Sequence, residues 1–308
     1  FFMGLFIATF SVASQTQFLS STVWTEREDL PIALAISGVL GIFATGFFNL
    51  LQGRISFPVL SILSLLVIVA ITTFVEYGEN FVTNADLLHY FSFVQVLTFT
   101  FITQLVFWGA FNRMFNLRQI KRVIGSVDVG TDIASILAFF TIPILLRWID
   151  IRTLYTIGLF SIIGFLVVFA IMSRRYLRNS QIAAVVEESQ NQQLSLVGMV
   201  KNRYILYFSL FIITSVVALR FIDYSFYNVS IAQFEATTAT NQNDLANFLS
   251  YFEMMVVIFG FLFTTFITDR IQQDYGLRVS LLINPLLLIL FTVAAFGIGS
   301  YFGFDKSK

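Results

Sequence analysis

Residues 154–175 read LYTIGLFSIIGFLVVFAIMSRR, an apolar run that is followed almost directly by two arginines. A helix of about 20 apolar residues crosses the hydrocarbon core of a bilayer, where lipid offers no partner to an unpaired backbone group. The stretch therefore predicts a transmembrane helix that ends at a basic membrane surface.

Eight further stretches of this kind occur along the chain. Hydrophobic residues make up 57% of the 308 residues, charged residues only 12%, and the mean hydropathy is +0.83, which excludes a soluble globular protein. We expect an all-α integral membrane bundle with nine transmembrane helices. The predicted spans are Phe1–Thr22, Pro31–Leu51, Pro58–Val75, Leu87–Asn112, Val123–Leu146, Leu154–Met172, Tyr204–Ile231, Leu245–Thr268 and Leu277–Tyr301.

The basic residues between the spans favour one orientation. With a cytoplasmic N-terminus and alternating helices, twelve Lys and Arg residues fall in the inner connectors and five in the outer ones. By the positive-inside rule, this bias predicts an N-terminus on the cytoplasmic side of the membrane. Because topology accounts for the basic residues, nothing in the charge pattern favours nucleic-acid binding.

One connector, between the sixth and seventh spans, is much longer than the others. It is basic at both ends and rich in glutamine between them. Six helices, a long inner linker and a second set of helices are typical of transporters with two parallel repeats; one long loop in an ordinary polytopic protein is the alternative. We therefore expect an N-terminal six-helix half at 1–173, a linker at 174–203 and a partial C-terminal half at 204–308.

Four motifs follow one another in a recognisable order. Residues 108–125 read WGAFNRMFNLRQIKRVIG, and shorter motifs are DYSF at 223–226, LANFL at 245–249 and NPLLL at 284–288. Together they resemble the nucleotide (ATP/ADP) carrier-like family of the major facilitator superfamily (MFS), especially bacterial members fused to HEAT repeats and a cyclic-nucleotide-binding domain. The resemblance implies an MFS-like fold of twelve helices, three of them beyond this chain, and alternating-access transport across a bacterial inner membrane. It also implies HEAT or cyclic-nucleotide-binding domains or other membrane subunits as further partners.

The chain departs from that family where nucleotide phosphates would bind. The family's first helix carries charged residues where residues 14–17 here read SQTQ, and a lysine of its seventh helix is replaced by Tyr227. A nucleoside triphosphate needs several cationic partners to leave water, and Arg220 is the only Lys or Arg away from the ends of a predicted span. We therefore expect a small polar or anionic solute as substrate, with membrane lipids as the surrounding partner.

Three ionisable residues inside the spans are candidates for substrate binding or coupling, because charge within a membrane is costly and usually functional. Arg220 and Asp223 are three residues apart on one helix face, beside Tyr227, and could bind an anion or form a self-neutralising ion pair. Glu253, in the eighth span, is a candidate for proton coupling or for pairing with Arg220 across helices.

Two further groups of polar residues are candidates for the transport pathway and its inner gate. Uncharged amides in the first and fourth spans could line a polar pathway or hold helices together: Gln15, Gln17 and Gln104. Charged residues at the inner ends of helices could lock a cytoplasmic gate: Arg118, Lys121, Arg122, Asp128, Asp132, Asp269 and Arg270.

Catalytic and metal-binding patterns are absent from the sequence. There is no cysteine and a single histidine, and no nucleophile–base set or phosphate-binding glycine loop is visible. We therefore expect neither an enzyme nor a bound cofactor or metal. The alternative to a carrier is a non-transporting membrane anchor or signalling module built on a repurposed MFS bundle.

Overall fold

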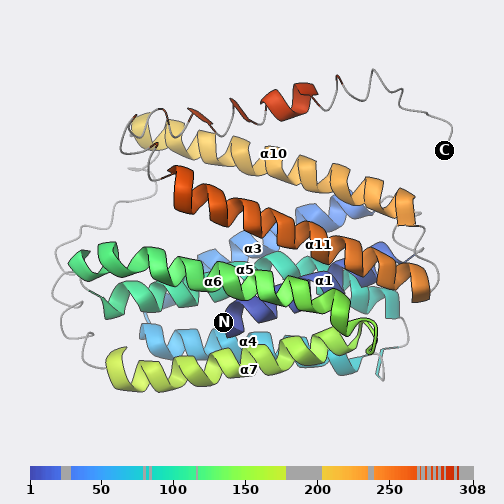
Figure 1. The fold of residues 1–308 in the computed structure, drawn as a ribbon. Helices are drawn as coiled ribbons and strands as arrows, with labels where there is room; N and C mark the ends of the chain where they lie inside the picture. Colours follow the sequence, from blue (N-terminus) through green and yellow to red (C-terminus); the bar gives the residue numbers. More distant parts are fainter. Residues whose placement is uncertain are drawn as a thin grey trace. The chain divides into compact units, whose positions relative to one another are not determined.

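The computed structural model describes residues 1–21, 29–78, 81–82, 85–115, 117–177, 203–234 and 239–268, with single residues and short groups between 271 and 297. Within these residues the chain is almost entirely helical and contains no strand (Figure 1). The helices are α1 Phe2–Leu19, α3 Leu30–Gln52, α4 Phe57–Tyr77, α5 Ala85–Met114, α6 Leu117–Leu145, α7 Thr153–Met172, η2 Ser173–Leu177, α10 Arg203–Phe234, α11 Ala239–Phe263 and η3 Thr264–Thr268.

Prolines set several of the helix ends. Pro31 and Pro58 lie in the first turns of α3 and α4, where the missing N–H costs nothing and the fixed φ suits a helix. Pro143 lies near the end of α6, and the helix stops shortly after it. Helix starts and stops therefore follow local chemistry, while the apolar runs supply the length.

Seven of the described helices are long and apolar enough to cross a membrane, which supports an integral membrane protein. They correspond to the predicted spans one to four and six to eight. The fifth prediction coincides with α6, within which Val129–Leu145 forms an apolar stretch of the described residues. Only scattered residues of the ninth predicted span are described, so the count of nine transmembrane helices remains a prediction.

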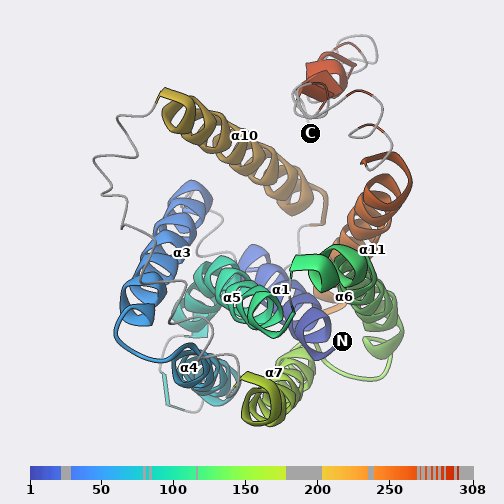
Figure 2. The ribbon, with the colours of Figure 1, turned by 90° about the vertical axis from the view of Figure 1, so that its left-hand side faces the viewer.

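The chain divides into two compact units, Phe1–Val257 and Ile258–Lys308, and the contacts below lie within the first. Its centre is α1, with 78% of the span buried, against 22% for α3 and 33% for α4. Helices α5, α6 and α7 pack around α1, as Figure 2 shows in end view. The exposed apolar faces of α3 and α4 are suited to lipid.

A buried polar contact joins three of the central helices. The Tyr155 hydroxyl on α7 lies within hydrogen-bonding distance of the hydroxyls of Ser14 on α1 (3.3 Å) and Ser92 on α5 (3.1 Å). Tyr155 is 2% exposed and both serines are fully buried. Hydrogen bonds between helices replace the hydrophobic driving force that lipid cannot supply.

Replacing Tyr155 by phenylalanine tests this contact. The Tyr155→Phe variant is expected to lose about 0.5–1.5 kcal/mol of stability, since both serine hydroxyls lose a partner in an otherwise apolar core. Chemical unfolding in detergent micelles measures the change. Tyr77, which is 50% exposed, provides the matched control. An equal loss in Tyr77→Phe would contradict a specific role for Tyr155.

Candidate functional site

The predicted ion pair on α10 is present. An Arg220 Nη1 donates to Asp223 Oδ2 across 2.8 Å, and both side chains are about one-third exposed, at 34% and 32%. The spacing of three residues places them on one helix face. Arg220 and Asp223 therefore form an ion pair within a span, and both side chains remain partly accessible.

Stacked phenylalanines hold α10 against α11 next to this ion pair. The Phe226 ring stacks on Phe252 with ring centroids 4.1 Å apart, and it also stacks on Phe248 at 5.9 Å. Asp223 lies one turn before Phe226, and Glu253 directly follows Phe252. The stack thus joins α10 and α11 at positions close in sequence to both carboxyl groups.

The predicted site residues of α10 and α11 come together as one group. Glu253 lies within electrostatic reach of Asp223, and the Tyr227 hydroxyl lies within reach of Glu253, Asp223 and Arg220. Glu253 is partly buried, and Tyr227 is 8% exposed. A cation, two carboxyl groups and a phenol therefore form a charged group, which we call the α10–α11 site.

An aromatic cluster adjoins the α10–α11 site and fastens it to the other helices. We use the name aromatic cluster for Phe18 on α1, Phe93 on α5 and Tyr227 on α10. Phe18 and Phe93 are stacked with centroids 4.3 Å apart, and Phe93 meets Tyr227 edge-on at 6.0 Å. Apolar residues of α3 and α11 complete the cluster: Leu30, Ala33, Leu245 and Leu249.

The aromatic cluster lies at one end of the helices, where α1 and α10 finish and α3, α5 and α11 begin. Tyr227 and Ser230 are the residues of α10 that are buried in its described part, and both belong to this end. Earlier in α10, Tyr207 is 68% exposed and Val217 is 63% exposed. In the first unit, therefore, α10 is packed at one end and open along the rest.

The predicted amides occupy three different environments. Gln15 is 6% exposed and its Oε1 has no hydrogen-bond partner, and the neighbouring Thr16 hydroxyl also lacks one. Gln17 is partly buried, whereas Gln104 is exposed on α5. Gln15 and Thr16 therefore retain buried polar atoms without partners on α1, and the three amides do not share one environment.

The predicted inner gate falls largely on residues whose side chains are not described. Arg118, Lys121, Arg122 and Asp128 belong to α6 by their backbone, while Asp269 and Arg270 lie outside the described residues. Asp132 is partly buried on α6. In the described part of the chain, no group of three or more His, Cys, Asp or Glu residues is arranged to hold a metal ion.

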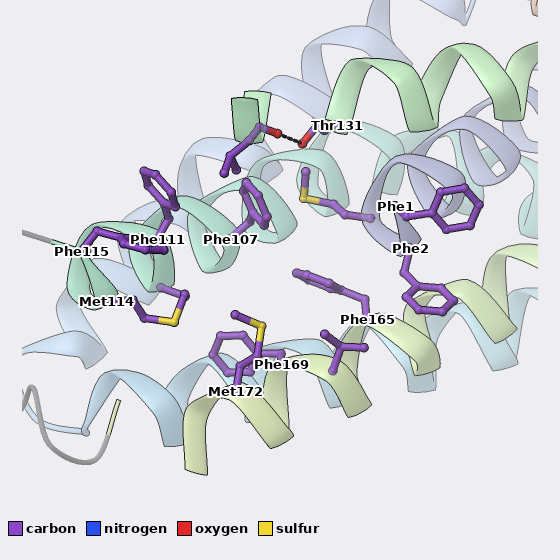
Figure 3. A pocket seen from close by; sticks show the side chains of 14 residues that line it. Phe1, Phe2, Phe107, Phe111, Met114, Phe115, Thr131, Phe165, Phe169 and Met172 are labelled. Carbon is purple, nitrogen blue, oxygen red and sulfur yellow. Dashed lines mark hydrogen bonds between the residues drawn. The ribbon is translucent and has the colours of Figure 1, made fainter. Parts of the chain in front are cut away.

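Two cavities were not anticipated from the sequence. A groove of about 320 Å³ lies between α3, α4 and α5, and its wall contains Gln95 and the unpartnered Thr98 hydroxyl. A cavity of about 300 Å³ lies between α1, α5, α6 and α7 (Figure 3). We call it the phenylalanine–methionine pocket, after Phe107, Phe111, Met114, Phe165, Phe169 and Met172. With 38 Phe residues in the chain, no sequence pattern singles these out.

Comparison with known proteins gives no relative for this chain. No family model, curated protein or solved structure matches it. The arguments that follow therefore rest on the residues and their geometry.

Proposed function

We propose that the chain is an inner-membrane carrier of the facilitator type, related to nucleotide-carrier-like proteins, that moves a small polar or anionic solute by alternating access. The supporting observation is that the described side chains of α10 that are buried, Tyr227 and Ser230, lie at the end of the helix that joins the aromatic cluster. Beside this closed end lies the α10–α11 site, whose ion pair remains accessible. A closed end, an open end and charged groups between them are what alternating access requires.

Each part of the α10–α11 site has a role in this proposal. Arg220 contacts the anionic or polar group of the solute, and Asp223 holds the arginine until the solute replaces it. Glu253 couples or gates the exchange, and Tyr227 links the site to the aromatic cluster. In this way, a change at the ion pair reaches the residues that close the end of the bundle.

The absence of cysteine from the chain permits a direct test of alternating access. Ser230 is 3% exposed and lies at the closed end of α10, and serine-to-cysteine replacement changes its size little. We expect the Ser230→Cys variant in vesicles to react slowly with a membrane-impermeant maleimide added from the side of the closed end. Slow reaction is expected because a carrier opens this end transiently, whereas a static bundle keeps it shut.

Two controls define the outcome of the labelling experiment. Asp150 is exposed in the turn between α6 and α7, so Asp150→Cys should react at once from the same side. The cysteine-free parent should not react at all. Complete protection of Ser230→Cys, with normal labelling of Asp150→Cys, would contradict alternating access.

A non-transporting membrane anchor or signalling module is the second candidate. It is favoured by the apolar linings of the two cavities, because neither the groove nor the phenylalanine–methionine pocket contains a charged side chain. This function predicts the protected outcome in the labelling experiment. The same measurement therefore separates the two candidates.

A further inference from the structure

The phenylalanine–methionine pocket has the chemistry of a hydrocarbon site. Its 14 lining residues are apolar except for Thr131, whose hydroxyl donates to the Val127 carbonyl oxygen at 3.4 Å (Figure 3). No lining side chain therefore presents an unpaired polar group to an occupant. A polar solute entering this pocket would lose its hydration without compensation, whereas an acyl chain would lose nothing.

Two exposed arginines lie in the sequence shortly after the last residue that lines the pocket. Met172 lines the pocket at the end of α7. Ser173 follows it, and Arg174 and Arg175 come after Ser173 in η2. Both arginines are exposed, while Ser173 between them and the pocket is buried. Short π-helical turns of this kind are frequent at functional positions.

Helix η2, which carries the two arginines, contacts two of the helices that form the walls of the pocket. Helix η2 packs against α5 as well as α7, and Met114 and Phe115 at the end of α5 are lining residues. Figure 3 shows Met114, Phe115 and Met172 grouped at one end of the pocket, away from Phe1 and Phe2. The two positive charges therefore lie next to that end.

We propose that the phenylalanine–methionine pocket binds an anionic phospholipid, with an acyl chain among the phenylalanines and methionines and the phosphate next to Arg174 and Arg175. Basic residues beside a cavity between transmembrane helices attract anionic headgroups, and the apolar walls retain the chain. A zwitterionic lipid offers the same chain but no net negative charge. The site should therefore distinguish lipids by headgroup. It requires no transport activity and is independent of the α10–α11 site.

The test uses native mass spectrometry of the purified protein in mixed micelles that contain equal amounts of phosphatidylglycerol and phosphatidylcholine with identical acyl chains. We expect the parent to retain phosphatidylglycerol in preference to phosphatidylcholine. Replacing both arginines, Arg174→Gln with Arg175→Gln, should lower that preference on the order of tenfold. The matched control removes two other exposed arginines, Arg54→Gln with Arg147→Gln, and should keep the preference.

A second pair of variants tests the pocket itself. Ala110 lines the phenylalanine–methionine pocket, so Ala110→Leu should reduce the bound amounts of both lipids. Ala44 lines the groove between α3, α4 and α5, so Ala44→Leu should leave them unchanged. Equal lipid preference in parent and arginine variant, or full binding in folded Ala110→Leu, would overturn the proposal. Because the arginines are exposed, their removal is compatible with folding, and that comparison decides the matter if Ala110→Leu fails to fold.

Discussion

Uptake into proteoliposomes is expected to fall at least about tenfold when Arg220 is replaced by alanine or Asp223 by asparagine, since a charged hydrogen bond contributes about 1.5–3 kcal/mol. Arg220→Ala removes the cation that contacts the solute, and Asp223→Asn leaves that cation without its 2.8 Å partner. Nucleotides, nucleosides and organic anions form the substrate panel. Both side chains are about one-third exposed, so the helices should remain folded.

The double variant distinguishes two roles of the ion pair: contact with the solute, and neutralisation of its own charges. Arg220→Gln combined with Asp223→Asn removes both charges together and leaves no unpaired ion in the span. If the pair serves only to neutralise itself, the double variant should transport normally while each single variant fails. If Arg220 contacts the solute, the double variant should fail as well. Normal uptake in both single variants would contradict the assignment of the α10–α11 site.

The helices themselves follow from the sequence with few exceptions. Long apolar runs give the seven helices of the described residues that are long and apolar enough to cross a membrane, because each run satisfies its backbone internally, whatever its neighbours are. The beginning of α6 is harder to predict, since its helix continues through charged residues where the apolar run has not yet begun. Hydrophobic composition predicts the apolar part of a helix but does not predict how far the helix continues through polar residues.

Only part of the α10–α11 site can be predicted from the sequence. Arg220 and Asp223 are three residues apart on one helix, so helical geometry alone predicts their pair. The approach of Glu253 to Asp223 depends on the stacking of Phe226 on Phe252, which joins two helices. Nothing in a single sequence identifies which of its phenylalanines stack. The site thus divides into a local part that periodicity reveals and a tertiary part that needs the structure.

The largest loss of stability is expected where Gly4 on α1 packs against α6. A Cβ atom at residue 4 would lie 2.9 Å from the Ser135 Oγ, 3.2 Å from the Ser135 backbone nitrogen and 3.2 Å from the Ala134 Cβ. Gly4→Leu therefore forces the two helices apart and should destabilise the protein by about 1–3 kcal/mol or more, as over-packing of a filled interior does. Thermal unfolding in detergent measures the change.

Gly46 on α3 supplies the matched control, because no atom lies within 4 Å of a Cβ placed there. Gly46→Leu should leave stability unchanged or raise it slightly, since leucine has the higher helix propensity. Small residues allow helices in a membrane to approach closely, and α6 presents alanine and serine at the position that α1 meets with glycine. A loss in Gly46→Leu equal to that in Gly4→Leu would show that glycine matters for the backbone of its own helix. A loss confined to Gly4→Leu would instead place the requirement at the contact between α1 and α6, the packing on which the centre of the bundle depends.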